Sequence, residues 1–220
     1  MELSLPSAFI ILALNPNKGR IVIDHLHFRY TLTGAVLLDL YASGEITLDQ
    51  KKIIPSFKRN GSELHDMIAE KMESAGRNWS ISRWLQVLTR KRKEIFNEYT
   101  GSLIRSGILT HERKYFLNII PYNRYYMRDT RLRMEIISGI KDVLLHGKQA
   151  DKKQIMLIGL VRASRAYGLI AGDWQERMLI RKRCREISGN DEFSTETDQI
   201  IRQVRLAIAA AVAASAAAHV

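Results

Sequence analysis

Twice in this chain, an apolar run typical of a helix meets Ser-Gly and continues as a run typical of a strand, and this repeat constrains the fold most. The first copy spans 37–48 through Ser43-Gly44, and the second spans 103–110 through Ser106-Gly107. Glycine can take the left-handed conformation that ends a helix, and the Ile, Leu and Thr that follow favour a strand. Each copy therefore predicts a helix followed at once by a β-hairpin, as in winged-helix proteins that read DNA and in helical scaffolds.

Net charge and cysteine content limit the classes of function that are possible but do not select one of them. The 220 residues contain 34 Lys and Arg against 23 Asp and Glu, a net charge of +11. This charge attracts polyanions such as nucleic acid or an anionic membrane surface, although a basic surface without a partner is equally consistent with it. A single cysteine, Cys184, excludes an internal disulfide and a cysteine-based zinc site, which fits a reducing cytoplasmic compartment.

Periodicity predicts a mainly α-helical chain with short hairpins, in one domain over 1–220. Helices are expected near 6–14, 25–41, 62–76, 80–90, 91–105, 129–146, 152–171, 172–188 and 198–220. A brief strand is expected at 20–23, and hairpins are expected at 45–57 and 107–120, the second turning at 111–114 before Pro121 redirects the chain. Gly34 is expected to allow close packing. The alanine-rich 206–220 run is interpreted as a buried helix because it is too short and weakly apolar to span a membrane.

No pattern of catalytic or metal-binding residues stands out. The chain lacks a glycine-rich phosphate loop, a dinucleotide fingerprint, a G-x-S-x-G elbow and an H-E-x-x-H motif. His25 and His27 are two residues apart and point to different sides of a helix, and the other four histidines are scattered. We therefore expect no catalytic residues, no metal, no cofactor and no enzymatic activity.

Three segments, taken in order, match the motifs of one family. They are 12–19, similar to an opening L-x-L-x-x-x-x-G turn, 32–46, similar to a glycine, apolar-acidic-Leu and glycine signature, and 103–109, similar to an L-V-x-x-G-[VI]-L segment. Trp84-Leu85 also lies near a W-[IL] helix motif. In these features the chain resembles the Golgi phosphoprotein 3 family of peripheral membrane proteins, and the resemblance covers nearly the whole chain.

The resemblance implies a helix bundle surrounded by amphipathic helices and short β-hairpins, without enzymatic activity. It also implies binding of phosphatidylinositol-4-phosphate or a similar phosphoinositide on the cytosolic face of membranes, capture of the cytosolic tails of membrane proteins, and self-association through a hairpin. The corresponding hairpin here is 115–127, and the residues concerned are Ile119, Ile120, Tyr122, Tyr125 and Tyr126. They are expected to contact a second copy, a membrane interface, or the molecule's own core.

The lipid site implied by the resemblance is only partly kept. The family's tryptophan and arginine fall on Asp24 and Thr33, and its second pair, two basic residues, falls on Lys93 and Phe96. Only Lys93 retains the basic character of the family site. Asp24 is expected to repel an anionic ligand.

A cationic cluster stands beside the altered positions. It comprises Arg90, Lys91, Arg92 and Lys93, and Arg29 is expected on the facing helix. Each basic residue near an anionic surface contributes about 1 kcal/mol, so the cluster predicts lipid binding by non-specific membrane attraction. The alternative is a solvated helix start.

A second basic patch has a regular spacing. Arg177, Arg181 and Arg185 recur every fourth residue and share one helix face. This stripe is open to binding an acidic protein tail or nucleic acid. The alternative is solvation of the whole basic stretch, which also includes Lys182 and Arg183, with some pairing to Glu176 and Glu186.

Three functions follow from these features. The leading hypothesis is a non-enzymatic adaptor of cytoplasmic location, peripherally associated with an anionic membrane surface. The second is a winged-helix-like nucleic-acid-binding protein, which requires a basic, polar recognition helix before a wing; the helices before both hairpins are instead apolar, which favours burial. The third is a structural protein that forms a homo-oligomer through the tyrosine-rich hairpin.

Overall fold

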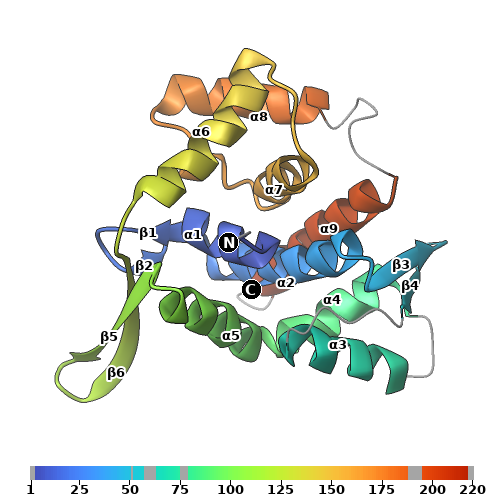
Figure 1. Ribbon diagram of the computed structural model, residues 1–220, viewed down its shortest axis with the longest axis horizontal. Helices are drawn as coiled ribbons and strands as arrows, with labels where there is room; N and C mark the ends of the chain where they lie inside the picture. Colours follow the sequence, from blue (N-terminus) through green and yellow to red (C-terminus); the bar gives the residue numbers. More distant parts are fainter. Residues whose placement is uncertain (1–2, 51, 57–62, 75–78, 188–194, 218–220) are drawn as a thin grey trace.

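Helices make up most of the protein (Figure 1). The structure is a computed structural model, and it describes residues 3–50, 52–56, 63–74, 79–187 and 195–217. Within these ranges the chain forms nine α-helices, one short 3-10 helix and three two-stranded antiparallel sheets. The predicted fold class, mainly α with short hairpins, is confirmed.

The elements follow one another in the order that the periodicity predicts. The helices are α1 Leu5–Ala13, α2 His25–Ala42, α3 Glu63–Ser74, α4 Ile81–Arg90, α5 Arg92–Arg105, α6 Arg131–His146, α7 Lys152–Ala163, the 3-10 helix η1 Tyr167–Leu169, α8 Trp174–Ile187 and α9 Thr195–Ala217. The strands are β1 Leu14–Asn15, β2 Arg20–Ile21, β3 Ile46–Asp49, β4 Lys52–Pro55, β5 Leu109–Phe116 and β6 Ile120–Met127. The predicted helix boundaries at Ser62, Gly76 and Ser188 lie outside the described residues.

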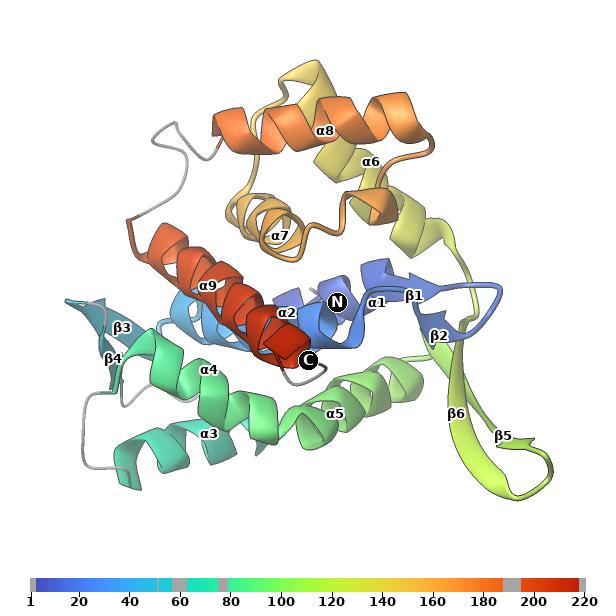
Figure 2. The ribbon, with the colours of Figure 1, turned by 180° about the vertical axis from the view of Figure 1, so that it is seen from behind.

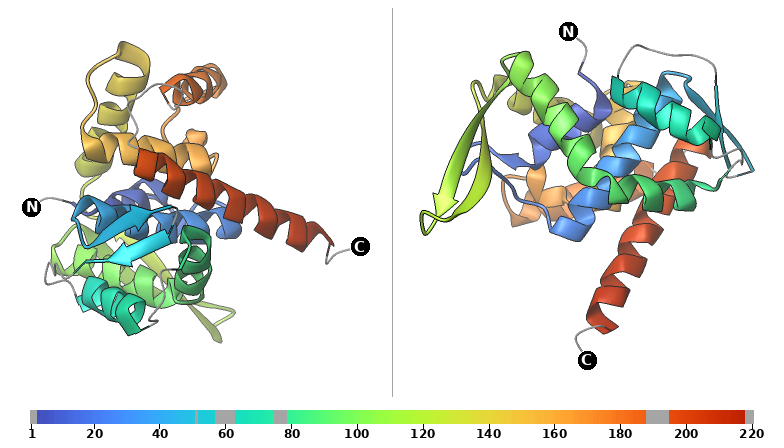
Figure 3. Two further views of the ribbon diagram at one scale, coloured as in Figure 1. Left: turned by 90° about the vertical axis from the view of Figure 1, so that its right-hand side faces the viewer. Right: turned by 90° about the horizontal axis from the view of Figure 1, so that it is seen from below.

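The helices lie in three tiers, with α2 in the central one (Figures 1 and 3). α6, α7 and α8 form the upper tier, α1, α2 and α9 the central tier, and α3, α4 and α5 the lower tier. α2 packs against α1, α4, α5, α7 and α9, and its residues 31–38 are all buried. Gly34 permits the approach of α9, because a Cβ at this position would lie 2.3 Å from Cγ2 of Val204. The close packing predicted at Gly34 is confirmed.

Both Ser-Gly units end a helix as predicted. Ser43 and Ser106 follow the last residues of α2 and α5, and Gly44 and Gly107 have φ values of 75° and 74°. Two residues after each serine, a backbone N–H donates to the carbonyl three residues before that serine: Glu45 to Leu40 and Ile108 to Leu103, both at 2.9 Å. This is the hydrogen bond of a Schellman motif, which uses the left-handed glycine to satisfy carbonyls at the helix end.

The second hairpin is longer than predicted, and its turn lies elsewhere. β5 and β6 pair from Leu109 with Met127 to Phe116 with Ile120, so 111–114 lies inside β5. The chain reverses at 117–119, where Leu117 and Asn118 have φ values of 49° and 58°, the left-handed pair of a tight hairpin turn. The predicted turn at 111–114 and the redirection at Pro121 are therefore wrong. Charged side chains fit a strand with solvent on its face, and proline fits a strand that pairs on one side only.

The helix predicted over 152–171 ends early. α7 stops at Ala163, and Arg165, with a φ of 55°, turns the chain into η1. A non-glycine residue with positive φ interrupts the helical hydrogen bonds, so the predicted single helix becomes α7 and η1. This corner places Arg162 and Arg165 at the end of α7, near α8 and α9.

α9 is buried along its first half only. Ile200, Val204 and Ile208 are buried, whereas Leu206 and Val212 are 52% and 42% exposed, and the helix extends out of the body (Figure 3). The interpretation of the whole run as buried is therefore wrong over 209–217, and 218–220 lie outside the described residues. Alanine forms helix readily without packing, and its methyl group has little apolar area to bury. Within the described residues, α9 is the helix that is long and apolar enough to cross a membrane, judged by length and composition alone.

Candidate functional site

A hollow of about 520 Å³ lies where β2, the first half of α2, the start of α5 and strand β6 meet. We call it the hairpin-base hollow. It is lined by Gly19, Arg20, Ile21, His25, Phe28, Arg29, Leu32, Arg92, Lys93, Phe96, Asn97, Asn123 and Tyr125. The lining combines cations, amides and aromatic rings from segments that are about 100 residues apart in the chain.

An aromatic series connects the hollow to the core. The Phe28 ring stacks on Phe9 of α1 with centroids 5.8 Å apart, and Phe96 meets Phe28 edge-on, also at 5.8 Å. Tyr125 of β6 continues the series, with its ring centroid 5.5 Å from that of Phe96. Stacked and edge-to-face pairs add to the stabilisation from burial. The series therefore fixes α2, α5 and β6 relative to one another, and these elements carry most of the polar side chains that line the hollow.

The turn before β2 docks directly on the hairpin. The Asn15 side chain accepts hydrogen bonds from the backbone N–H groups of Asn17 and Lys18, at 3.0 and 2.8 Å. Gly19 has a φ of 60°, and a Cβ there would lie 2.9 Å from the Tyr126 ring. The Tyr125 N–H donates to the Gly19 carbonyl at 2.9 Å. Glycine is required for this approach, which sets Arg20 at the edge of the hollow.

Four basic side chains line the hairpin-base hollow: Arg20, Arg29, Arg92 and Lys93. The Arg29 Nε is buried and has no hydrogen-bond partner among the described residues. Arg92 makes a long contact of 3.5 Å between Nη1 and the Thr89 carbonyl. In the described ranges, none of the four is ion-paired with a carboxylate. Unpaired guanidinium and ammonium groups around one hollow suit a phosphate group.

The structure brings three of the five predicted lipid-binding cations to this hollow, namely Arg29, Arg92 and Lys93. The Lys91 Nζ is 2.8 Å from Glu94 Oε1, and the side chain lines a different hollow beside α3. Arg90 is exposed at the end of α4 and does not line the hairpin-base hollow. Sequence reasoning missed Arg20, whose position depends on the docking of the Asn15 turn against β6.

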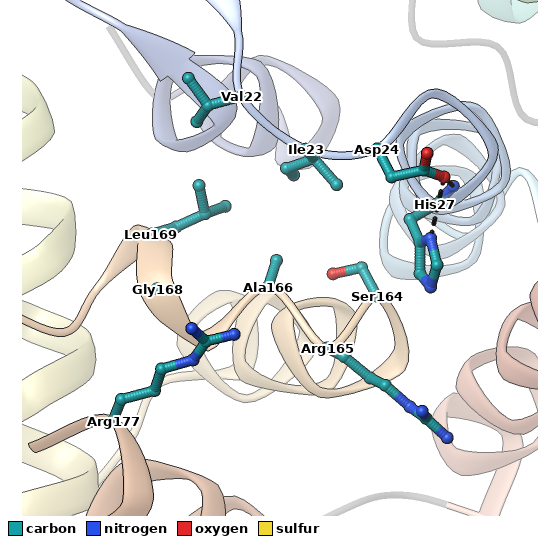
Figure 4. A pocket seen from close by; sticks show the side chains of 10 residues that line it. All are labelled: Val22, Ile23, Asp24, His27, Ser164, Arg165, Ala166, Gly168, Leu169 and Arg177. Atoms are coloured by element: carbon teal, nitrogen blue, oxygen red, sulfur yellow. Dashed lines mark hydrogen bonds and ion pairs between the residues drawn. The ribbon is translucent and has the colours of Figure 1, made fainter. Parts of the chain in front are cut away.

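Asp24 and Thr33 lie outside the hairpin-base hollow. Thr33 is buried, and its Oγ1 is 3.0 Å from the Tyr30 carbonyl oxygen and 3.3 Å from Oγ1 of Thr89 on α4. Asp24 caps α2 and lines a second hollow of about 510 Å³ (Figure 4). Its Oδ1 lies 3.0 Å from the His27 Nδ1, and this hydrogen bond holds the pKa of Asp24 below its usual range. The Asp24 carboxylate therefore does not line the hairpin-base hollow, although His25, the next residue, does.

The hairpin that borders the hollow ends in an exposed apolar tip. Leu117 and Ile119 are 75% and 78% exposed, and Tyr115, Phe116 and Ile120 are more than half exposed. Figure 2 shows the hairpin projecting from the body beyond β2 and α5. Contiguous exposed apolar side chains mark a surface that contacts another molecule or a membrane. We call these five residues the hairpin tip.

The five hairpin residues selected from the sequence divide between the tip and the base. Ile119 and Ile120 belong to the hairpin tip, whereas Tyr122, Tyr125 and Tyr126 are half-buried nearer the body. Tyr125 closes the aromatic series, Tyr126 lies against Gly19, and the Arg124 guanidinium lies 4.8 Å from the Tyr122 ring centroid. Two of the five are thus accessible to a partner, and the tyrosines mainly hold the hairpin base.

A buried polar cluster beside the first Ser-Gly unit was not foreseen from the sequence. The His65 Nδ1 is 2.9 Å from Glu45 Oε1, and the His65 Nε2 is 3.1 Å from the Tyr99 hydroxyl and 3.7 Å from Asp39 Oδ2. Burial raises the pKa of Asp39. None of the four residues lines the hollows described here, so the cluster joins α2, α3 and α5 internally. The described residues contain no group of His, Cys, Asp and Glu arranged to hold a metal ion.

The family model described as Golgi phosphoprotein 3 matches residues 5–216. The matched region runs from the start of α1 almost to the end of α9 and includes the hairpin-base hollow and the hairpin.

Proposed function

Because the chain belongs to the Golgi phosphoprotein 3 family, we propose that it is a non-enzymatic peripheral protein of anionic membranes. In this proposal the protein approaches from the cytoplasmic side, a lipid head-group phosphate enters the hairpin-base hollow, and the hairpin tip enters the interface. The observation that carries the proposal is the continuity of these two features, since Asn123 and Tyr125 of β6 line the hollow and Ile120 begins the same strand at the tip.

The two features would contribute in different ways. Each basic residue near an anionic surface adds about 1 kcal/mol, and this attraction weakens as salt shortens the Debye length. The hairpin tip adds apolar burial, which moderate salt does not screen. Binding that is reduced but not abolished by salt would therefore report both contacts.

The chemistry of the hollow favours a phosphomonoester head group. Arginine offers several N–H donors in a planar fork, and the buried Nε of Arg29 has no hydrogen-bond partner in the described part of the chain. The side-chain amides of Asn97 and Asn123 add donors and acceptors for sugar hydroxyls. We expect phosphatidylinositol-4-phosphate to bind more tightly than phosphatidylserine at equal surface charge.

Vesicle co-sedimentation with neutral, phosphatidylserine and phosphatidylinositol-4-phosphate liposomes at low and moderate salt tests this function. Changing Arg29, Arg92 and Lys93 together to Gln is expected to weaken binding by about 100-fold, from roughly 1 kcal/mol per charge. The matched control changes Arg90, Lys91 and Arg105 to Gln. Arg90 ends α4, Lys91 precedes α5 and Arg105 ends α5. The three carry the same total charge as the altered set, but they do not line the hollow.

The control is expected to bind within a few-fold of the unaltered protein. Equal weakening by both triple variants would assign the effect to overall charge and remove the hollow from the proposal. Absence of binding to every vesicle at low salt would end the membrane proposal altogether.

Self-association is the second candidate function, because the hairpin tip would also be covered by a second copy. Sedimentation velocity across micromolar concentrations, without lipid, tests it. A dimer that Leu117→Ser and Ile119→Ser together abolish would favour this reading.

A nucleic-acid function has less support from the geometry, since α2 and α5 bury the apolar residues that precede both hairpins, among them Leu37, Leu38, Ile95 and Leu103. A DNA shift that persists at moderate salt would restore that hypothesis.

A further inference from the structure

Arginine side chains crowd a hollow of about 500 Å³ between the end of α7, one face of α8 and the middle of α9. Six arginines line it: Arg162, Arg165, Arg177, Arg181, Arg185 and Arg205. The other lining residues are Tyr167, Trp174 and Met178, so no carboxylate of the described residues lines the space. We call it the arginine hollow. It shares no lining residue with the hairpin-base hollow.

Three segments of the chain supply these arginines. Arg177, Arg181 and Arg185 form the stripe on α8 that their spacing predicts. Arg162 and Arg165 come from the corner that ends α7, and Arg205 comes from α9. Figures 1 and 2 show α7 between α8 and α9, and α7 packs against both, so the three sources meet where the upper and central tiers join. The predicted stripe is thus one side of a larger basic site.

The six arginines lack acidic partners within the described ranges. The carboxylates expected to pair with the α8 stripe have other partners: Glu176 pairs with Lys141 at 2.6 Å, and Glu186 pairs with Arg183 at 2.8 Å. Asp198, close by on α9, pairs with Arg202 at 3.0 Å. Of the pairings expected for this basic stretch, that with Glu186 is made by Arg183 and Lys182, whereas Glu176 pairs with Lys141 of α6. Among the described residues, neither acid is paired with Arg177, Arg181 or Arg185.

Three of the arginines act electrostatically on one side chain, the phenol of Tyr167. Burial raises the pKa of Tyr167, and the charges of Arg162, Arg181 and Arg185 act on the same phenol in the opposite direction. Like charges held around one space repel, and this repulsion falls when an anion enters.

The hollow in Figure 4 adjoins the arginine hollow, but its carboxylate, that of Asp24, does not pair with the arginines. Arg165 and Arg177 line both spaces. In Figure 4 the Arg165 side chain points away from the Asp24 and His27 pair, and the Arg177 guanidinium lies toward Gly168. Asp24 is held by His27 and by the backbone at the start of α2. Asp24, the acid that lines the hollow in Figure 4, is therefore engaged with His27 and the α2 backbone.

From this convergence we propose that the arginine hollow binds a ligand carrying two or more phosphate groups. A single phosphate is satisfied by two or three arginine forks, whereas six arginines from three segments match several phosphates held together. Trp174, which is 71% exposed, and Met178 form an apolar rim beside the cations. The same chemistry occurs in a soluble inositol polyphosphate and in a polyphosphoinositide lipid head group. The proposal does not rest on the hairpin-base hollow.

Isothermal titration of the full chain with inositol hexakisphosphate, in about 0.1 M salt where exposed charges are partly screened, tests the site. Changing Arg177, Arg181 and Arg185 together to Gln is expected to weaken binding by about 100-fold, since each lost guanidinium removes charge-assisted hydrogen bonds. The matched control changes Arg131, Lys182 and Arg183 to Gln, which removes the same charge from side chains outside the hollow. Circular dichroism and thermal unfolding check that both variants are folded.

A second variant separates the hollow from the α8 stripe alone. Arg162→Gln with Arg205→Gln alters only α7 and α9 and is expected to weaken binding by about tenfold or more. Undiminished binding in this variant, or equal weakening in the matched control, would overturn the proposal. So would the absence of inositol hexakisphosphate binding to the unaltered protein together with no binding to vesicles that contain phosphatidylinositol-4,5-bisphosphate.

The two ligand sources are distinguished by the same variants. Binding of inositol hexakisphosphate but not of bisphosphate vesicles by the unaltered protein, lost in the Arg177, Arg181 and Arg185 variant, supports a soluble polyphosphate. Vesicle binding that is stronger than the titrated binding and is lost in the same variant supports the lipid source. Binding of RNA or DNA without binding of either phosphate probe would replace the proposal with a nucleic-acid site.

Discussion

The hairpin after Gly44 and the hairpin after Gly107 leave their helices with nearly equal glycine φ values, 75° and 74°, but they lie in different surroundings. In the first, β3 and β4 have four residues each, and Ile46 and Ile53 are buried in the core. In the second, β5 and β6 have eight residues each and end in the exposed hairpin tip. The same local signal thus begins one hairpin that completes the core and one that presents a surface.

The difference lies in what each hairpin meets. Glu45, which directly follows the first glycine, is buried against His65 of α3, and this contact holds the first unit inside the molecule. The second hairpin is held at its base, where Tyr125 joins the aromatic series and its N–H bonds to Gly19. Beyond that base nothing in the described chain covers its apolar residues. The tip of the second hairpin is therefore available to contact another molecule, because no tertiary contact in the described chain covers it.

The largest effect is expected from removing the internal partner of the first unit. His65→Leu leaves Glu45 without its imidazole partner in the interior, and breaking such a pair lowers the free energy of unfolding by about 3–5 kcal/mol. Urea denaturation measures this loss. In the second unit, His111→Leu removes an exposed contact of 3.0 Å with Asn123, and a change within about 0.5 kcal/mol is expected. Similar losses in both variants would show that the two units are equally embedded.

The glycines should show an effect of intermediate size that is equal in the two units. Gly44→Ala and Gly107→Ala each place a side chain in the left-handed region, which costs about 1–2 kcal/mol. At Gly107 the nearest atom to the added Cβ is Arg128 Nη1 at 3.8 Å, so the cost there arises from the backbone conformation and not from a clash. Thermal or urea unfolding of both variants tests this equality. A loss at one site that is several times larger would refute a shared local origin.

The hairpin tip should have little effect on stability and a large effect on binding. Leu117→Ser with Ile119→Ser alters side chains that are mostly in water, so we expect the free energy of unfolding to change by less than about 0.5 kcal/mol. Vesicle co-sedimentation at moderate salt, where the tip is expected to dominate, should show weaker binding. Destabilisation comparable to that of His65→Leu would mean that the second hairpin is part of the core.

The smallest effects concern two carboxyl groups that flank the units. Burial raises the pKa of Asp39, before Gly44, whereas hydrogen bonds from the Arg131 backbone and side chain lower the pKa of Asp129, just after β6. NMR titration should give midpoints above and below the reference value of 3.8. Asp39 retains its proton longer in the folded state, so its contribution to stability falls as pH rises above 3.8. The contribution of Asp129 is lost as pH falls below 3.8. Shifts of the same sign would contradict the difference in environment.

Capping residues and prolines in the sequence correctly predicted those helix ends that are set by residues close by in the chain. Ser80 caps α4 and accepts a hydrogen bond from the Arg83 N–H at 3.3 Å, and Pro6 lies in the first turn of α1. The predicted second turn failed because 111–114 is charged but extended, whereas the actual turn uses Leu117 and Asn118 in left-handed conformations. The charge of 111–114 could not reveal that this ribbon has solvent on both sides.

The candidate site was predictable only in part. Lys93 and Arg92 follow from the basic run at the start of α5, and Arg29 from the expectation of a facing helix. Arg20 required the docking of Gly19 against Tyr126, and the arginine hollow required the corner at Arg165 that brings α7 near α8 and α9. These are contacts between distant segments, and a single sequence does not display them.

The sequence by itself determined the ends of α2, α4 and α5, which faces are apolar, the excess of basic residues and the two Ser-Gly joints, because these depend on backbone propensity and short-range hydrogen bonds. Only the tertiary structure decided which hairpin is buried, where α9 leaves the core and which cations share a hollow. Burial and charge clustering depend on the positions of segments far apart in the chain. Here α2 positions α1, α4, α5, α7 and α9, and these helices in turn carry α8 and the second hairpin.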